Sequence, residues 1–316
     1  MMRILSLHNT RSMNKNMGHV PWMAYGALAL STSLIGTYVG LSKLMVLVFP
    51  IFLLAWLRFG IAALAMLAWV KRRASEPPLS RRDRWLLFLE SFLGNFLFSI
   101  CMLFGIRASS ALAAGVIMAG IPAAVALMSW AVLGERIPRR VMAAIACAVL
   151  GIGLVATTRN ASGGPPGSIW GPVLLLAAMF CEASYVVIGK QLTAQVSAKR
   201  ISALINLWGL LLVTPLGLWQ ALSFDFHAVA GASWAMLLFY ALAASVATVW
   251  LWMTGLVAVP AASAGVFMVF LPISAALVGL VFLGEHMNTP QALAYGLALL
   301  GVLLATWPAR GRTAAS

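Results

Sequence analysis

The chain has 316 residues, of which 62% are hydrophobic and 9% charged, and its mean hydropathy is +0.97. A soluble domain carries about a quarter charged residues, so this composition excludes an ordinary soluble fold and indicates an integral membrane protein. The net charge of +14 does not indicate nucleic-acid binding, because the basic residues fall between apolar runs instead of gathering on one domain.

Ten apolar runs follow a polar tail over residues 1–20, and each approaches the roughly 20 residues that a membrane-spanning helix needs. They are 22–41, 48–70, 85–106, 109–133, 141–157, 169–189, 201–219, 234–256, 261–283 and 291–307. The stretch "RNASGGPPGS" (159–168), rich in Gly, Pro and Ser, is the expected linker between a first half (21–158) and a second half (169–308). Residues 309–316 form a short tail. The tail over residues 1–20 has no signal-peptide core, and Met13 or Met17 is an alternative start.

The positive charges predict which side of the membrane each loop faces. If the N-terminus is inside, seventeen Lys and Arg residues lie on the cytoplasmic side and three on the other. Cytoplasmic loops carry an excess of Lys and Arg, so both termini are predicted to be cytoplasmic, in a bacterial-type inner membrane.

The two halves repeat one another. The stretch "AAGVIMAGIPAAVALMSWAVLGERIP" (113–138) matches "SAGVFMVFLPISAALVGLVFLGEHMN" (263–288) at an offset of 150 residues. Paired positions include Gly115 with Gly265, Pro122 with Pro272, Gly134 with Gly284 and Glu135 with Glu285. Five helices per half is an odd number, so the second half must be inverted relative to the first. The sequence therefore predicts an all-α integral membrane fold of ten transmembrane helices in two inverted five-helix repeats, an arrangement typical of transporters.

This pattern resembles the drug/metabolite transporter superfamily and, within it, the EamA-type ten-helix transporters. The resemblance rests on the Gly-x-x-Met-x-x-x-x-Pro core of the fourth and ninth runs, on their Leu-Gly-Glu ends and on "LLAWLRFGIAAL" (53–64) in the second run. It covers nearly all of residues 20–308. The resemblance implies a carrier of small metabolites such as amino acids, often an exporter, with a central cavity between the halves.

Two ionisable residues within the apolar runs are the main candidates for the transport pathway. Glu182 lies two-thirds along the sixth run, where an ionisable group costs about 2.5–3.5 kcal/mol and is rarely present without a role. A proton-coupling carboxylate is the functional interpretation, and a structural ion pair is the alternative. Arg58, near the middle of the second run, is either an anchor for a substrate carboxylate or the partner of Glu182. A structural or gating role for Arg58 has equal weight.

Other polar or kink-forming residues complete the set of candidates. Tyr38 and Tyr185 occupy matching positions in the first and sixth runs and are expected to line the cavity, although small residues around them also favour close helix packing. Asn95 in the third run needs a partner for its amide and is a second pathway candidate. Pro122 and Pro272 lie in the middle of their runs, where a missing amide bond permits a kink, and they are the candidate hinges. Glu135 and Glu285 are expected to be structural marks of the repeat.

The sequence argues against catalysis. All four histidines lie in tails or loops, the spanning runs contain no aspartate, and no phosphate-binding loop is present. We therefore expect no enzyme activity, no metal and no cofactor. The expected function is a secondary transporter, with a small molecule, protons and the lipid bilayer as its partners, and a flippase for a lipid-linked sugar is the alternative.

Overall fold

The computed structural model describes residues 22–72, 76–133, 137–157, 169–192, 196–258 and 265–306, and the regular structure of these residues is helical. The first half contains α2 (Trp22–Val48), α3 (Ile51–Ala65), η1 (Leu67–Trp69), α4 (Arg81–Ser91), η2 (Phe92–Leu97), α5 (Phe98–Arg107), α6 (Ala111–Met118), α7 (Ile121–Leu133) and α8 (Arg139–Thr157). The second half contains α9 (Trp170–Leu192), α10 (Ala198–Leu222), η4 (Phe226–Ala228), α11 (Gly231–Leu242), η5 (Ala243–Ala247), α12 (Thr248–Ala258), η6 (Gly265–Val269), α14 (Phe270–Phe282) and α15 (Thr289–Thr306). The two predicted tails, the linker over 159–168, and Gly134 with Glu135 lie outside the described residues.

Seven of the described helical stretches are long and apolar enough to cross a membrane, and two shorter apolar helices accompany them. The seven are Trp22–Val48, Arg81–Arg107, Ala111–Ala131, Trp170–Gly189, Lys199–Leu222, Gly231–Trp252 and Thr289–Thr306. The shorter ones are Ile51–Ala65 and Val266–Phe282. The chain is therefore an all-helical, multi-pass membrane protein. The count of ten crossings and the cytoplasmic placement of both ends stay predictions.

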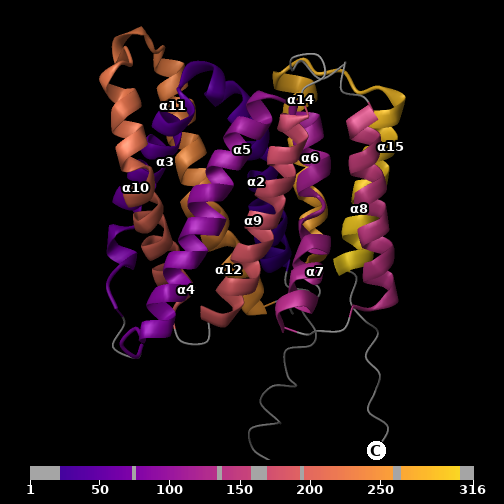
Figure 1. Cartoon of the computed structure of the whole chain (residues 1–316), viewed down its shortest axis with the longest axis horizontal. Helices are drawn as coiled ribbons and strands as arrows, with labels where there is room; N and C mark the ends of the chain where they lie inside the picture. The colour runs from indigo at the N-terminus through magenta and orange to yellow at the C-terminus, as the bar shows by residue number, and fades with distance from the viewer. Residues whose placement is uncertain are drawn as a thin grey trace, which may run out of the picture.

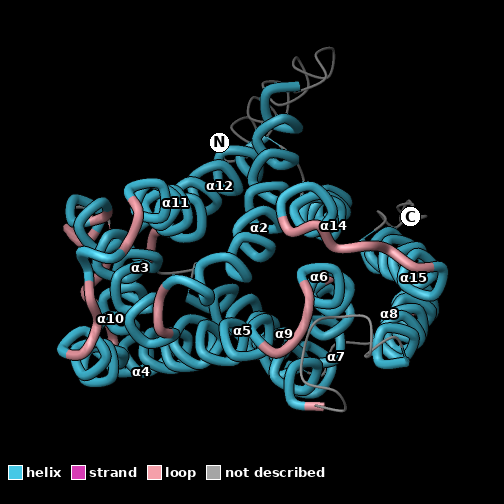
Figure 2. The backbone as a smooth tube through the Cα atoms, turned by 90° about the horizontal axis from the view of Figure 1, so that it is seen from above, coloured by secondary structure: helices cyan, strands magenta, loops and turns pink. Residues whose placement is uncertain are grey.

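The helix contacts interlock the two halves. The first helix of the first half, α2, packs against α12 and α14 of the second half, and the first helix of the second half, α9, packs against α5 and α7 of the first half. The remaining main contacts pair equivalent helices: α3 with α10, α6 with α14 and α8 with α15. Figure 2 shows α8 and α15 side by side at one edge of the bundle and α3 with α10 at the other. Neither half of the described bundle can bury its apolar faces without the other.

Close contact between α2 and α14 depends on glycine. A methyl group built on Gly36 would overlap the carbonyl oxygen of Leu271 and the Oγ of Ser274, and one on Gly40 would overlap the side chain of Val278. Small residues at helix interfaces let backbones approach closely in membranes, where no hydrophobic force drives helices together.

Gly36→Ala should therefore lower the melting temperature of the purified protein in detergent, because overpacking costs about 1–3 kcal/mol. Gly26→Ala in the same helix is the matched control, since nothing lies within 4 Å of a methyl group built there. Circular dichroism melting measures both variants. Equal melting temperatures for Gly36→Ala and the wild type would show that the α2–α14 contact yields without cost.

Four helix interruptions occur at matching places in the two halves. The π-helical turns η2 and η5 interrupt the third and eighth predicted runs. In the fourth run, α6 stops at Met118 and α7 starts at Ile121, so Pro122 lies in the first turn of a new helix. In the ninth run, Pro272 lies in the first turn of α14, directly after the 3₁₀ turn η6. We expected each proline within a kinked helix; instead, each lies where a helix restarts, since a first-turn residue needs no amide donor.

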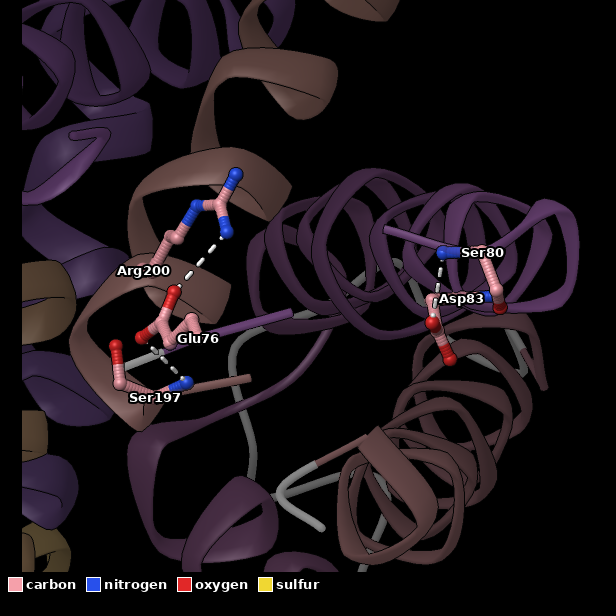
Figure 3. Close-up of polar contacts among 5 residues, drawn as sticks. All are labelled: Glu76, Ser80, Asp83, Ser197 and Arg200. Atoms are coloured by element: carbon pink, nitrogen blue, oxygen red, sulfur yellow. Dashed lines mark hydrogen bonds and ion pairs between the residues drawn. The ribbon is translucent and has the colours of Figure 1, made fainter. Parts of the chain in front are cut away.

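A loop at the lower end of the bundle in Figure 1 is tied to the second half by Glu76. Its carboxylate accepts hydrogen bonds from the backbone N–H of Ser197, at 3.1 Å, and from Nη1 of Arg200, at 3.0 Å (Figure 3). Hydrogen bonding by Ser197 and then Arg200 holds the pKa of Glu76 below its usual range. Its contribution to stability is thus present at neutral pH and is lost only as the pH falls through that lowered pKa. Ser80 and Asp83 cap α4 nearby with two reciprocal hydrogen bonds of 3.1 and 2.9 Å (Figure 3).

Candidate transport cavity

A cavity of about 340 Å³ lies between the two halves. Its lining comes from α2, α3, α4, η2 and α5 of the first half and from α9, α10, η5, α12 and η6 of the second half. The five residues expected in the pathway all line it: Tyr38, Arg58, Asn95, Glu182 and Tyr185. Ligand pockets for small molecules have volumes of about 300–1,000 Å³, so the cavity suits a small metabolite.

Arg58 reaches the cavity from α3, and only part of its guanidinium is hydrogen-bonded within the described residues. The side chain is buried, and its Nη2 donates a hydrogen bond to Oγ of Ser99 at 2.6 Å. The Ser99 hydroxyl in turn donates a hydrogen bond to the carbonyl of Asn95 at 2.5 Å. The guanidinium also lies 4.4 Å from the ring centre of Phe59. Nε has no hydrogen-bond partner within the described residues. A buried donor without an acceptor is costly, so an anionic group that reaches Nε would accept a hydrogen bond from it without breaking an existing one.

Glu182 of α9 is half-buried at the cavity wall. Within the described residues, no hydrogen bond or ion pair joins it to Arg58 or to another side chain. The tight pair that would hold this carboxylate in its charged form is absent from this conformation. Glu182 therefore presents a carboxylate at the cavity wall that no described side chain pairs.

The π turn η2 shapes the wall that carries Asn95. Asn95 Nδ2 donates to the carbonyl of Ile205 at 3.1 Å, and Ser91 Oγ donates to the same carbonyl at 2.7 Å. Gly94 in this turn lets the side chain of Tyr185 pack directly against the backbone. The second π turn, η5, lines the cavity from the other half with Ser245. Single π turns within α-helices are frequent at functional sites, and no residue pattern in the sequence indicated either turn.

Glu90 is a cavity residue that is not among the candidates named from the sequence. It lies in the last turn of α4, which begins at Arg81, and it is 1% exposed and lines the cavity. Its Oε2 has no partner within the described residues. Asn206 of α10 is similar: Nδ2 donates to the carbonyl of Phe59 at 2.9 Å, whereas Oδ1 has no partner there.

Comparison with known proteins now gives the family. The EamA-like transporter family model matches residues 22–157 and 169–307, which are the two halves. The chain belongs to the EamA-like transporter family. An uncharacterized transporter of Bacillus subtilis (strain 168), YetK, is 34% identical over 264 residues, covering 83% of this chain and 80% of that protein. A protein crystal structure matches with a TM-score of 0.60 at 18% identity, over 88% of this chain and 95% of that chain, and shows a shared fold.

The expected membership of the drug/metabolite transporter superfamily is thereby confirmed, and with it a two-repeat membrane transporter. Groups of three or more His, Cys, Asp or Glu side chains that can hold a metal ion are absent from the described residues.

At the upper end of this EamA-like transporter, Glu285 of the second half is hydrogen-bonded to the first half. Glu285, in the connection between α14 and α15 (Figure 1), accepts hydrogen bonds from the backbone N–H groups of Ala111, at 2.7 Å, and Leu112, at 2.9 Å. Those groups begin α6, and a carboxylate at a helix N-terminus is favoured by the helix dipole. Gly284, with φ of 63°, turns the chain so that Glu285 can reach them.

Lys43 of α2 binds the connection between α5 and α6, which leads into the α6 amides whose hydrogen bonds Glu285 accepts. Its Nζ donates to the carbonyls of Ile106, at 2.9 Å, Arg107, at 3.2 Å, and Ser109 at the end of α5. A cation at a helix C-terminus complements the dipole in the same way. We call Lys43, Glu285 and the connection 106–112 the upper seal.

Proposed function

We propose that this protein is a secondary transporter that exports small polar metabolites such as amino acids from the cytoplasm across a bacterial-type inner membrane. The observation that carries the proposal is the cavity between the halves, because it holds an arginine donor, Nε of Arg58, and two carboxylates, Glu90 and Glu182, for which the described residues supply no hydrogen-bond partner. A zwitterion carries an anionic group that suits the arginine and a cationic group that suits a carboxylate. Such charges are retained inside a membrane protein only where they are paired, hydrated or used.

The arrangement of the cavity favours loading from the cytoplasm. The excess of Lys and Arg in the loops at the lower end of Figure 1 supports a cytoplasmic position for that end. The cavity lining continues toward that end through Met66, Gly189 and Ser202, whereas the upper seal ties the halves together at the opposite end. Alternating access then requires the upper seal to open and the lower lining to close, with the restarts at Pro122 and Pro272 as hinges.

Proton exchange supplies the energy in this proposal, with Glu182 as the exchanging group. It faces Arg58, Glu90, Tyr38 and Tyr185 across the cavity and is bonded to none of them in the described structure. A carboxylate that loses its proton to water and regains it when the cargo leaves couples the two movements. The accompanying charge change also alters the electrostatic field at Arg58.

Purified protein in proteoliposomes tests the proposal. We expect an imposed pH gradient to drive the uptake of at least one amino acid from a panel of radiolabelled metabolites, above the flux in empty liposomes. A parallel sample with headgroup-labelled lipids measures lipid translocation. Lipid movement without metabolite flux would replace the proposal with a flippase, and the absence of both fluxes would remove the transport assignment made here.

A further inference from the structure

The most unusual group in the cavity is the carboxylate of Glu90. It is 1% exposed, and its Oε2 has no donor within the described residues. The other oxygen, Oε1, lies against Gly189 of α9, where a built methyl carbon would come within 2.8 Å of it. Gly189 therefore leaves the space into which this carboxylate projects. A buried carboxylate with no donor must take up a proton or a cationic group.

The charges around Glu90 favour the cationic group. Three side chains that are charged in their ordinary forms line the cavity: Arg58, Glu90 and Glu182. Glu90 and Glu182 are close enough to interact electrostatically, so the two carboxylates repel one another when both are charged. Arg58 donates to Ser99 through Nη2, which leaves its Nε as the buried lining donor without a partner in the described residues, against the Oε2 acceptor of Glu90. Asn206 adds a further acceptor without a donor, its buried Oδ1.

We propose that Glu90 binds the ammonium group of the transported molecule. An ammonium group has three N–H donors and one positive charge, which matches an excess of acceptor oxygens and of negative charge. Arg58 Nε then takes the anionic group of the same molecule. The inference rests on the proposed function, which it deepens: the cargo is a primary amine that also carries an acidic group, and Glu90 selects for the amine.

Matched compounds test the contributions of the ammonium and carboxylate groups of the cargo separately. Leucine, 4-methylpentanoate and 3-methylbutylamine share one apolar skeleton and differ only in the ammonium and carboxylate groups. Phenylalanine, 3-phenylpropanoate and 2-phenylethylamine form a second set with a larger skeleton. Affinities of all six for the purified full-length protein in detergent are measured by isothermal titration calorimetry.

The wild type should bind the amino acid of at least one set about tenfold or more tightly than its amine-free analogue, the ratio expected for a charge-assisted hydrogen bond. In Glu90→Gln this preference should shrink to about twofold, with the affinity for the amine-free analogue unchanged. Glu90→Asp, which keeps the charge, should retain part of the preference. Glu76→Gln, the same substitution outside the cavity, should retain all of it.

Two results would overturn the inference. One is a full amine preference in Glu90→Gln, which would assign Glu90 a proton or a structural role. The other is equal affinity of the wild type for each amine-bearing compound and its amine-free analogue, or no binding of any of the six. Binding of 2-phenylethylamine that disappears in Glu90→Gln, without amino-acid flux in proteoliposomes, would keep the inference and remove the proposed function.

Discussion

Glu182→Gln should abolish the acceleration of transport by a pH gradient while leaving exchange at equal pH close to the wild-type rate. Glutamine has the shape of a protonated glutamate and cannot release a proton, so the variant stays in one of the two states that coupling requires. Glu182 has no hydrogen-bonded partner among the described residues, so the substitution breaks no existing contact. We expect the gradient-driven flux to fall by about tenfold or more, which for a rate corresponds to about 1.4 kcal/mol in the limiting barrier.

The measurement is counterflow in proteoliposomes with and without an imposed pH gradient, using the amino acid with the greatest flux in the wild type. Tyr185→Phe is the matched control in the same helix, since it alters a neighbouring cavity residue and removes no carboxylate. A gradient response of wild-type size in Glu182→Gln would exclude this carboxylate from coupling. Loss of exchange at equal pH as well would indicate instead that Glu182 contacts the cargo.

Much of the fold is predictable from the sequence because membrane helices are encoded locally. Apolar length and punctuation predict helices close to their observed bounds: the sixth run, expected over 169–189, is α9 over Trp170–Leu192. The repeat predicts two halves, which the family match over 22–157 and 169–307 reproduces. The five pathway candidates reach one cavity because ionisable and amide groups inside apolar runs have few other places to lie.

Contacts between distant segments explain what the sequence did not indicate. Lys43 and Glu285 meet at one connection although they are far apart in the chain, and no local pattern predicts that one binds carbonyls and the other amides. Glu90 required knowledge of where α4 begins, since its depth in the membrane decides between an interfacial and a buried side chain.

The repeat is symmetric in its backbone but not in its chemistry. At the offset that pairs Tyr38 with Tyr185, Glu182 corresponds to Ile35, and at the offset that pairs Gly115 with Gly265, Glu90 corresponds to Tyr240. Both carboxylates therefore have uncharged mates. Two inverted halves can exchange conformations during transport, while the two carboxylates stay on α4 and α9.

Glu285→Gln should expose the cavity to the upper side of the membrane. Each oxygen of the Glu285 carboxylate accepts one backbone N–H at the start of α6, and a neutral amide offers one acceptor oxygen and no charge. A hydrogen bond to a charged group contributes about 1.5–3 kcal/mol, so its loss should shift the balance between sealed and open forms by about tenfold or more. The readout is the labelling rate of a single cysteine at Ser245, which lines the cavity, by a membrane-impermeant maleimide added from outside.

The background for this experiment replaces Cys101, Cys147 and Cys181 with alanine, so that only position 245 reacts. Glu76→Gln is the matched control, because Glu76 also bonds a helix N-terminus across the halves but at the lower end, where its loss cannot open the upper side. We expect faster labelling in Glu285→Gln alone. Equal labelling rates in both variants would mean that the upper seal stabilises the fold without gating the cavity, and a large fall in melting temperature in Glu285→Gln would point the same way. The duplicated Leu-Gly-Glu would then serve helix termination only, and control of access would lie with the helix restarts at Pro122 and Pro272.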